Sequence, residues 1–290
     1  MKKSLLVVLI VAILSSAAVA ERISVGTSIY PLYDWVRVIG GDRVDAFCLL
    51  EPGASPHTFA PRPRDVARIS GARLFFVVGR GLEPWVEKLV KAAKSEIEVV
   101  RLGEGMDEKL KALGYPDELV SDPHIWLDPL AAKMMVARIA DELCRIDADG
   151  CKLYRSNLAN YSKVLDDLAA EMRALGERFA GKKVVIYHGA FRHFLFRCGI
   201  GLLGVVEEFP GQEPSSLHLK KLMDAMKREG VSVVFVEPQH SAREARIIAS
   251  EIGGTYEVLD PLGGVPGRDT YEKLIRFNLR QLEKVFKGDR

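Results

Sequence analysis

The chain has 290 residues, and its 41 basic and 39 acidic side chains leave a net charge of +2 at pH 7. Because the two signs are interspersed, the composition argues against a nucleic-acid partner, which would need a clustered basic face. The hydrophobic content of 48% is enough for sizeable cores, and the length predicts two domains.

The first twenty residues have the features of a secretory signal peptide. Two lysines precede a short apolar run that ends at Leu14, and Ala18-Val19-Ala20 supplies the small residues for cleavage after Ala20. The alternative, a membrane anchor, needs about 20 apolar residues, and this run is shorter. No lipoprotein signal follows, because the nearest cysteine is Cys48. We therefore expect an exported protein, periplasmic or extracytoplasmic, that is soluble once residues 1–20 are removed.

Residues 21–148 alternate short apolar segments with helix-like ones. The apolar segments are rich in Val, Ile, Leu and Phe, which is typical of strands buried on both faces of a parallel sheet. We therefore expect an N-terminal α/β lobe with helices on both sides of its sheet. The predicted strands span 23–30, 45–50, 73–78 and 97–102, and the predicted helices span 31–41, 63–70, 83–93 and 130–145.

Residues 149–181 carry an apolar stripe from Tyr154 to Phe179, in alternating steps of four and three residues. At 1.5 Å per residue, a helix of this length extends roughly 45 Å, which is enough to join two lobes. A coiled-coil strand has the same pattern and stays open as the alternative. A helical connection predicts limited movement between the lobes, whereas a Gly/Ser linker would allow much more.

Residues 182–290 repeat the strand-and-helix alternation without a clear repeat of sequence. Repeated βα units imply an open, doubly wound sheet. The expected fold class is therefore α/β, with two doubly wound parallel-sheet lobes joined by one long helix and a site in the cleft between the lobes. The predicted strands span 183–188, 201–207, 232–237 and 255–260, and the predicted helices end at 196 or span 216–229, 242–251 and 270–286.

Four cysteines remain in an exported chain, where an oxidising compartment permits disulfides. Cys144 and Cys151 are close in sequence and would close a short loop, but the sequence leaves open whether they pair. Cys48 and Cys198 lie in apolar surroundings, which favours buried free thiols. No Cys-x-x-Cys pair indicates a zinc knuckle or a redox motif.

Candidate ligand residues follow the predicted strands, because open α/β sheets bind ligands beyond the carboxyl ends of their strands. His57 and His124 come from the first half, and His188 and Asp260 come from the second. If the halves face each other, three imidazoles and one carboxylate make a credible transition-metal site. Singly, each histidine is as readily a surface or hydrogen-bonded residue, and Asp260 before a proline is often a turn residue.

The segment DPHIWLDP, residues 122–129, holds one of these histidines on stiff backbone. Pro123 and Pro129 bar regular helix through it, so His124 is fixed in position. Asp122 and Asp128 are candidates to accept the second ring N–H of His124, which metal-bound histidines usually donate. They would equally serve to cap neighbouring backbone.

The other histidines are first given structural roles. We expect His193 to pack in the interior and His218 to be exposed near a helix start. His240 follows a predicted strand end at Glu237, so both residues are candidates to approach the cleft from behind the ligands.

Taken together, the motifs resemble the zinc/manganese-type metal-binding proteins of bacterial and archaeal ABC importers. The resemblance covers essentially the whole mature chain and implies two lobes, one long linking helix and a metal between the lobes. It assigns the metal ligands to the residues already reached from the strand ends: His57, His124, His188 and Asp260. The motifs that carry it are LEPGASPHTFAPRPRDVARI (50–69), SDPHIWLDP (121–129), YHGAFRHFLFRCGI (187–200), GQEPS (211–215), VFVEPQHSAREARIIASEIG (234–253) and VLDPLGG (258–264).

The resemblance implies a binding protein that catalyses no reaction and delivers a divalent metal to the membrane permease of an importer. We expect a monomer. Manganese-type members tend to carry Glu where His188 stands, and imidazole suits Zn²⁺ better than Mn²⁺, so Zn²⁺ is the expected cargo, with Mn²⁺ or Fe²⁺ as alternatives. The His-rich loop of many zinc members would fall near 103–121, where this chain has no histidine.

Two other functions are alternatives to a transport receptor. A secreted zinc hydrolase would use three histidines and an open water position, but the chain has no H-E-x-x-H helix and no G-x-S-x-G elbow. An adhesin role is known for some members of the resembled family. No low-complexity stalk or lipid-anchor cysteine supports that role here.

Overall fold

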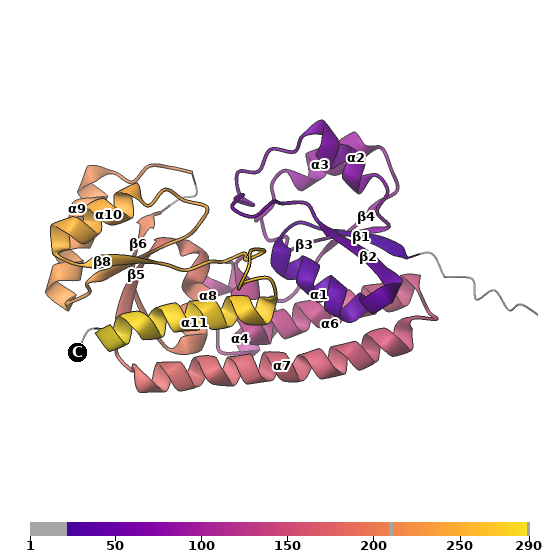
Figure 1. Cartoon of the computed structure of the whole chain (residues 1–290). Coiled ribbons are helices and arrows are strands. Elements are labelled where there is room, and N and C mark those ends of the chain that lie inside the picture. The colour runs from indigo at the N-terminus through magenta and orange to yellow at the C-terminus, as the bar shows by residue number, and fades with distance from the viewer. Residues whose placement is uncertain (1–21, 209–210, 289–290) are drawn as a thin grey trace, which may run out of the picture.

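The computed structural model describes residues 22–208 and 211–288, and these form two α/β lobes side by side (Figure 1). The first lobe is built on a four-stranded parallel sheet in the order β2-β1-β3-β4. All four residues of β3 are buried, as expected for a strand with helices on both faces. Its strands are β1 (Ile23–Thr27), β2 (Val44–Cys48), β3 (Leu74–Val77) and β4 (Glu98–Arg101).

Proline starts several helices of this lobe, because its fixed φ suits the first helical turn. Pro31, Pro63 and Pro129 each occupy a first-turn position. Two short helices, α4 and α5, were not predicted, and they lie in the segment 103–121, where the resemblance would place a His-rich loop. The helices are α1 (Tyr30–Gly40), η1 (Gly41–Arg43), α2 (Pro63–Ile69), α3 (Val86–Ala93), α4 (Asp107–Ala112), α5 (Asp117–Val120), η2 (Ile125–Leu127) and α6 (Pro129–Ile146).

The second lobe repeats this plan with the sheet order β6-β5-β7-β8, again all parallel. Helices α9 and α10 end where Gly230 and Gly253 adopt φ of +66°, a conformation that glycine enters at little cost. The elements are β5 (Lys183–His188), η3 (Gly189–Phe191), α8 (Arg192–Cys198), β6 (Gly201–Glu207), α9 (Ser216–Glu229), β7 (Val233–Val236), α10 (Arg243–Ile252), β8 (Thr255–Val258) and α11 (Tyr271–Gly288).

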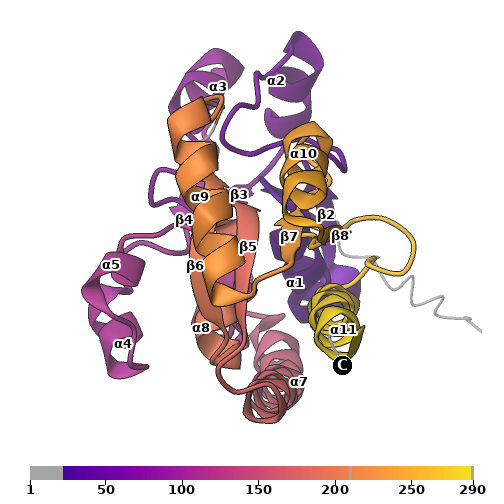
Figure 2. The same cartoon turned by 90° about the vertical axis from the view of Figure 1, so that its left-hand side faces the viewer.

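A 28-residue helix, α7 (Cys151–Arg178), runs beneath both lobes, with α11 lying alongside it (Figures 1 and 2). Its apolar stripe is buried inside the molecule, where it packs against α1, α6, α8 and α11. The long linking helix is therefore confirmed. Its apolar stripe packs against helices of the same chain and does not form a coiled coil. One hydrophobic core extends through α7 from the first sheet to the second, so the lobes share an interior.

The turn between α6 and α7 is held by a disulfide and an ion pair. Cys144 and Cys151 form the disulfide that the sequence left open. Within the same turn, the Asp147 carboxylate accepts two hydrogen bonds of 2.7 Å from Arg43 and one of 2.5 Å from Tyr154. These contacts fix the corner at which the chain leaves the first lobe.

Some predictions are not tested by this architecture. The signal peptide, residues 1–20, lies outside the described residues, so its cleavage after Ala20 stays a prediction. So do the domain limits 21–148, 149–181 and 182–290. Between residues 22 and 288, leaving aside 209–210, no helix is long and apolar enough to cross a membrane.

Candidate metal centre

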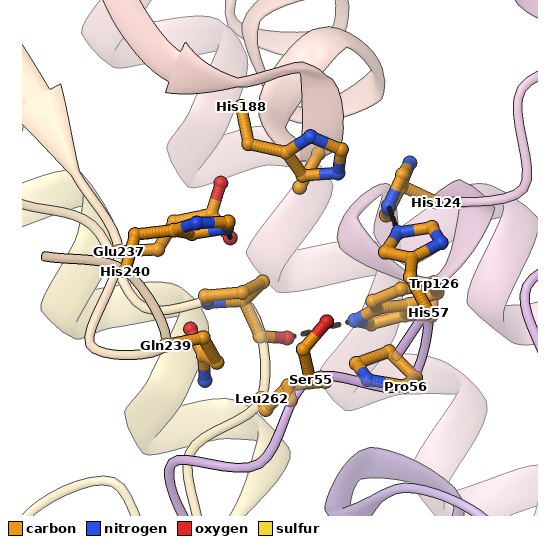
Figure 3. Close-up of a pocket in the computed structure, with 12 residues that line it drawn as sticks. Ser55, Pro56, His57, His124, Trp126, His188, Glu237, Gln239, His240 and Leu262 are labelled. Atoms are coloured by element: carbon orange, nitrogen blue, oxygen red, sulfur yellow. Dashed lines mark hydrogen bonds and ion pairs between the residues drawn. The ribbon is translucent and has the colours of Figure 1, made fainter. Parts of the chain in front are cut away.

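Three imidazole rings converge between the lobes (Figure 3). His57 lies in the loop after β2, His124 directly precedes η2, and His188 is the last residue of β5. One ring nitrogen from each lies within 4.8 Å of the others. The structure thus brings together three of the four candidate residues, although His124 follows α5 and not a strand.

The spacing of the rings suits a metal ion. The three ring centroids are 5.1–5.2 Å apart in every pair. The Nε2 atoms of His57 and His124 lie 3.1 Å apart. Two nitrogens that bind Zn²⁺ at 2.0–2.1 Å in tetrahedral geometry are about 3.4 Å apart. A small adjustment of the rings would therefore place one cation among them.

His124 is aimed by Asp122. Asp122 Oδ1 accepts hydrogen bonds from the His124 backbone N–H, at 2.8 Å, and from ring Nδ1, at 2.9 Å. Donation from Nδ1 leaves Nε2 free to face the cluster, the arrangement usual for metal-bound histidine. Burial raises the pKa of Asp122, but the hydrogen bonds and charge of His124, together with the charge of His193, lower it more, so that it comes to about 2.

Asp128 caps backbone and does not orient His124, which is the second of the two roles that the sequence allowed for it. Its side chain accepts from the Leu130 N–H at 2.9 Å and caps α6. It is fully buried and pairs with Arg197 at 2.7 Å, and it also accepts from the Tyr115 hydroxyl. The first Asp-Pro pair therefore orients the histidine, and the second starts the helix.

Two tryptophans hold the backbone next to candidate ligands. The Trp85 indole N–H donates to the carbonyl of Pro56, the residue before His57, at 2.8 Å. The Trp126 indole N–H donates to the carbonyl of Pro261, the residue after Asp260, also at 2.8 Å. The second bond joins the two lobes directly.

The electrostatic environment keeps the His57 and His188 rings uncharged before any metal arrives. Burial, and then the neighbouring histidines, lower the pKa of His57 to about 4 and that of His188 to about 2. Neutral imidazole is the form that binds a metal. These two candidate ligands therefore need not lose protons when a cation enters near neutral pH.

The wall behind His188 is polar and incompletely satisfied. Glu207 Oε2 lies 3.7 Å from Nδ1 of His188 and 3.7 Å from Nδ1 of His240. Within the described residues, both ring nitrogens of His188, Glu207 Oε2 and Glu237 Oε1 have no hydrogen-bond partner. Burial, then the charges of Glu207 and Asp260, raise the pKa of Glu237 well above its usual range. Glu237 and His240 both line the cavity between the lobes that His57, His124 and His188 also line (Figure 3).

Asp260, the fourth candidate, does not join the three histidines in the cluster that the described residues form. Its backbone exchanges two 2.8 Å hydrogen bonds with the Asn278 side chain on α11. Its Oδ1 accepts from the N–H groups of Leu262 and Gly263, at 3.0 Å each, and its Oδ2 pairs with Arg268 at 2.9 Å. The residues that follow it, Pro261 and Leu262, do line the cavity.

Comparison with known proteins agrees with this fold. The family model described as zinc-uptake complex component A, periplasmic, matches residues 25–285. The chain belongs to this family.

Members of the zinc-uptake component A family are similar to the chain along most of its length. The high-affinity zinc uptake system protein ZnuA of Bacillus subtilis (strain 168) is 30% identical over 261 residues, which are 87% of this chain and 82% of that protein. The zinc-binding protein AdcA of Streptococcus pyogenes serotype M1 is 25% identical, and the match spans 90% of this chain but only 55% of AdcA. A crystal structure of ZnuA superposes with a TM-score of 0.79 at 31% identity, covering 90% of this chain and 98% of that one.

The structure also reveals residues around the three histidines that neither the sequence motifs nor the family assignment identified. Sequence reasoning missed Glu207, Trp85 and Arg268. Glu207 is the last residue of β6 and so met the strand-end criterion that found His188. His193 is fully buried, as expected, with Nε2 3.3 Å from the Asp122 carbonyl. The prediction that His218 is exposed is wrong, because a ring nitrogen lies 2.8 Å from the Val205 carbonyl and the side chain is 22% exposed.

Proposed function

We propose that this protein is an extracytoplasmic receptor that captures Zn²⁺ and delivers it to the membrane permease of an ABC importer. The observation that carries the proposal is the convergence of three imidazoles from both lobes, His57, His124 and His188. The names of its relatives, a zinc uptake protein and a zinc-binding protein, support the same cargo.

Donor chemistry selects among the divalent metals. Nitrogen ligands favour Zn²⁺ over Mn²⁺, and the general affinity order runs in the same direction. Asp260 is proposed as the fourth ligand, since it lies two residues after β8 and directly before Pro261 and Leu262 of the cavity wall. A receptor of the same type for Mn²⁺ or Fe²⁺ is the alternative, because a carboxylate in place of one histidine contact would suit those ions better.

The proposed protein is a carrier and not an enzyme. A catalytic zinc keeps a water position open, whereas a carrier site closes around its cargo with protein ligands. We also propose that the protein acts as a monomer outside the cytoplasm, without a nucleic-acid partner. The Cys144–Cys151 disulfide supports export, because disulfides persist in oxidising compartments.

The test is metal analysis of the mature protein, recovered after export. Native mass spectrometry with elemental analysis should find one tightly bound zinc, and excess Mn²⁺ should not displace it in a competitive titration. Alanine variants of His57, His124 and His188 should each weaken zinc binding sharply, while His218→Ala, a matched control away from the cluster, should not. Preferential manganese or iron occupancy would keep the receptor and change its cargo. Absence of metal binding at any concentration would overturn the site.

A further inference from the structure

The carboxylate of Asp260 is fully engaged by donors inside its own lobe. Oδ1 accepts from two backbone N–H groups, and Oδ2 receives the guanidinium of Arg268 at 2.9 Å. The Asp260 side chain is 3% exposed, so water offers it little alternative solvation. Charge-assisted hydrogen bonds of this kind are stronger than neutral ones. Any metal that uses Asp260 therefore meets a cation already in place.

Arg268 has one partner for its charge. Among the described residues, Asp260 is the carboxylate with which Arg268 forms an ion pair. The guanidinium also lies 4.6 Å from the centre of the Phe277 ring on α11, a favourable position for a cation over an aromatic face. The side chain is 22% exposed and so reaches solvent. It can leave Asp260 while staying close to it.

The backbone that carries Arg268 is anchored, which confines the movement to its side chain. At one end of the loop, Asn278 clamps Asp260. At the other end, the Tyr30 hydroxyl donates to the Asp269 carbonyl at 3.1 Å, and Asp34 accepts from the Tyr271 N–H at 2.8 Å. Both of those contacts come from α1 of the first lobe. Arg268 therefore stands at a fixed place beside the boundary between the lobes.

We infer that Arg268 competes with the metal for Asp260, so that it lowers zinc affinity and speeds zinc release. This inference rests on the proposed function, because it takes Asp260 as the fourth ligand. Two cations held at one carboxylate oxygen in a poorly hydrated cleft repel each other strongly. Zinc must therefore displace Arg268 from Oδ2 to gain this ligand. When zinc leaves, Arg268 takes the carboxylate back.

The size of the effect of Arg268 on zinc affinity depends on the fraction of time for which Asp260 is not paired with Arg268. Apparent affinity falls in proportion to the fraction of protein in the binding-competent state. If the ion pair holds Asp260 nine-tenths of the time without metal, removing Arg268 tightens zinc binding about tenfold. Removing the re-pairing cation also slows release, because nothing then recaptures the carboxylate.

The experiment measures zinc affinity by chelator competition and zinc release by stopped flow into excess chelator, using the mature protein. The variants are Arg268→Ala, Arg268→Lys, Asp260→Asn and the double variant Asp260→Asn/Arg268→Ala. Arg276→Ala is the matched control, because Arg276 pairs with Glu171 at 2.8 Å instead of with Asp260. Thermal melting of each metal-free variant checks that it is folded.

We expect Arg268→Ala to bind zinc more tightly and release it more slowly than the wild type. Arg268→Lys should fall between them, because a lysine keeps the charge but lacks the planar fork. Asp260→Asn should bind more weakly, and the double variant should match Asp260→Asn. Arg276→Ala should behave as the wild type.

Other outcomes overturn the inference in distinguishable ways. Unchanged or weaker binding by Arg268→Ala would show that Arg268 does not compete. Tighter binding that persists in the Asp260→Asn background would show a general charge effect and not competition at one oxygen. If Asp260→Asn binds zinc as the wild type does, the inference fails and the receptor function stands. If the wild type binds no zinc, the proposed function fails as well.

Discussion

Replacement of Asp122 tests whether this side chain orients His124 for zinc binding. Asp122 Oδ1 accepts both the ring Nδ1–H and the backbone N–H of His124. Asn at this position keeps an oxygen that accepts the ring N–H but loses the charge. Hydrogen bonds to charged groups contribute about 1.5–3 kcal/mol and neutral ones about 1 kcal/mol. Asp122→Asn should therefore cost about 1.4 kcal/mol of zinc binding, which is about tenfold in Kd.

Asp122→Ala removes the acceptor altogether and should cost more. Loss of the partner that orients a metal ligand typically lowers metal affinity by about 10–100-fold, so we expect a value near the upper end. The assay is competitive zinc titration at constant pH, with thermal melting of the metal-free proteins. If both variants bind zinc like the wild type, Asp122 does not orient His124 in the loaded protein.

The second aspartate of the same segment provides the contrast. Asp128→Asn leaves the His124 contacts intact but breaks the buried pair with Arg197. Removing one partner of a buried ion pair costs about 3–5 kcal/mol. At about 2–4 °C per kcal/mol, even the lower figure lowers Tm by about 6–12 °C. A variant of Asp128 that lost zinc affinity without losing stability would contradict the division of roles.

Three further predictions concern pH, the disulfide and a helix contact. Because the pKa values of His57 and His188 are about 4 and about 2, protons compete with zinc for these two ligands only near and below pH 4. NMR titration of the metal-free protein should therefore find both of these rings still neutral at pH 5.5, and a midpoint near the ordinary value of about 6.5 for either ring would contradict the lowered values. The double variant Cys144→Ser/Cys151→Ser opens a loop of sequence separation 7. By the chain-entropy relation its free energy of unfolding, measured in urea, should fall by about 2.4 kcal/mol. Cys48→Ser is the control, and an equal fall in the control and the double variant would show that Asp147 holds the turn without the disulfide. A Cβ on Gly176 would lie 1.5 Å from the Cys198 carbonyl oxygen, so Gly176→Ala should destabilise the α7–α8 contact by at least about 1–3 kcal/mol. Gly71→Ala, where a Cβ meets nothing within 4 Å, should unfold at nearly the wild-type urea concentration, and equal losses in the two variants would argue against the helix contact.

Much of the fold could be predicted because local patterns and tertiary packing agree. The four strands of each lobe lie where short segments rich in Val, Ile, Leu and Phe predicted them, and β5 and β6 match to the residue. The stripe from Tyr154 to Leu175 marks the buried face of α7. Helices α4 and α5 were missed because they have only 6 and 4 residues, too few to show a periodic pattern.

The site was predicted in part for a similar reason. Strand ends are visible in sequence, and they located His188, which ends β5, and His57, which lies in the loop after β2. His124 was found from its proline-bracketed segment, residues 122–129, and follows α5 and not a strand. Which groups engage a carboxylate is decided by loops, and no periodicity reveals that Arg268 folds back onto Asp260. Asp122 and Asp128 both precede proline, yet their roles differ because one lies beside His124 and the other begins α6. The partners of these carboxylates are set by tertiary contacts, which local sequence patterns do not reveal.

The placement of the tryptophans gives the protein a built-in optical signal. It has three of them. Trp126 lies 5.2 Å from the His124 ring, centre to centre, and Trp85 holds the carbonyl next to His57. Trp35 is fully buried against Tyr271 on α11. Cargo arriving among the histidines would thus alter the emission of two indoles against the constant background of the third, so that loading and unloading are observable in unlabelled protein.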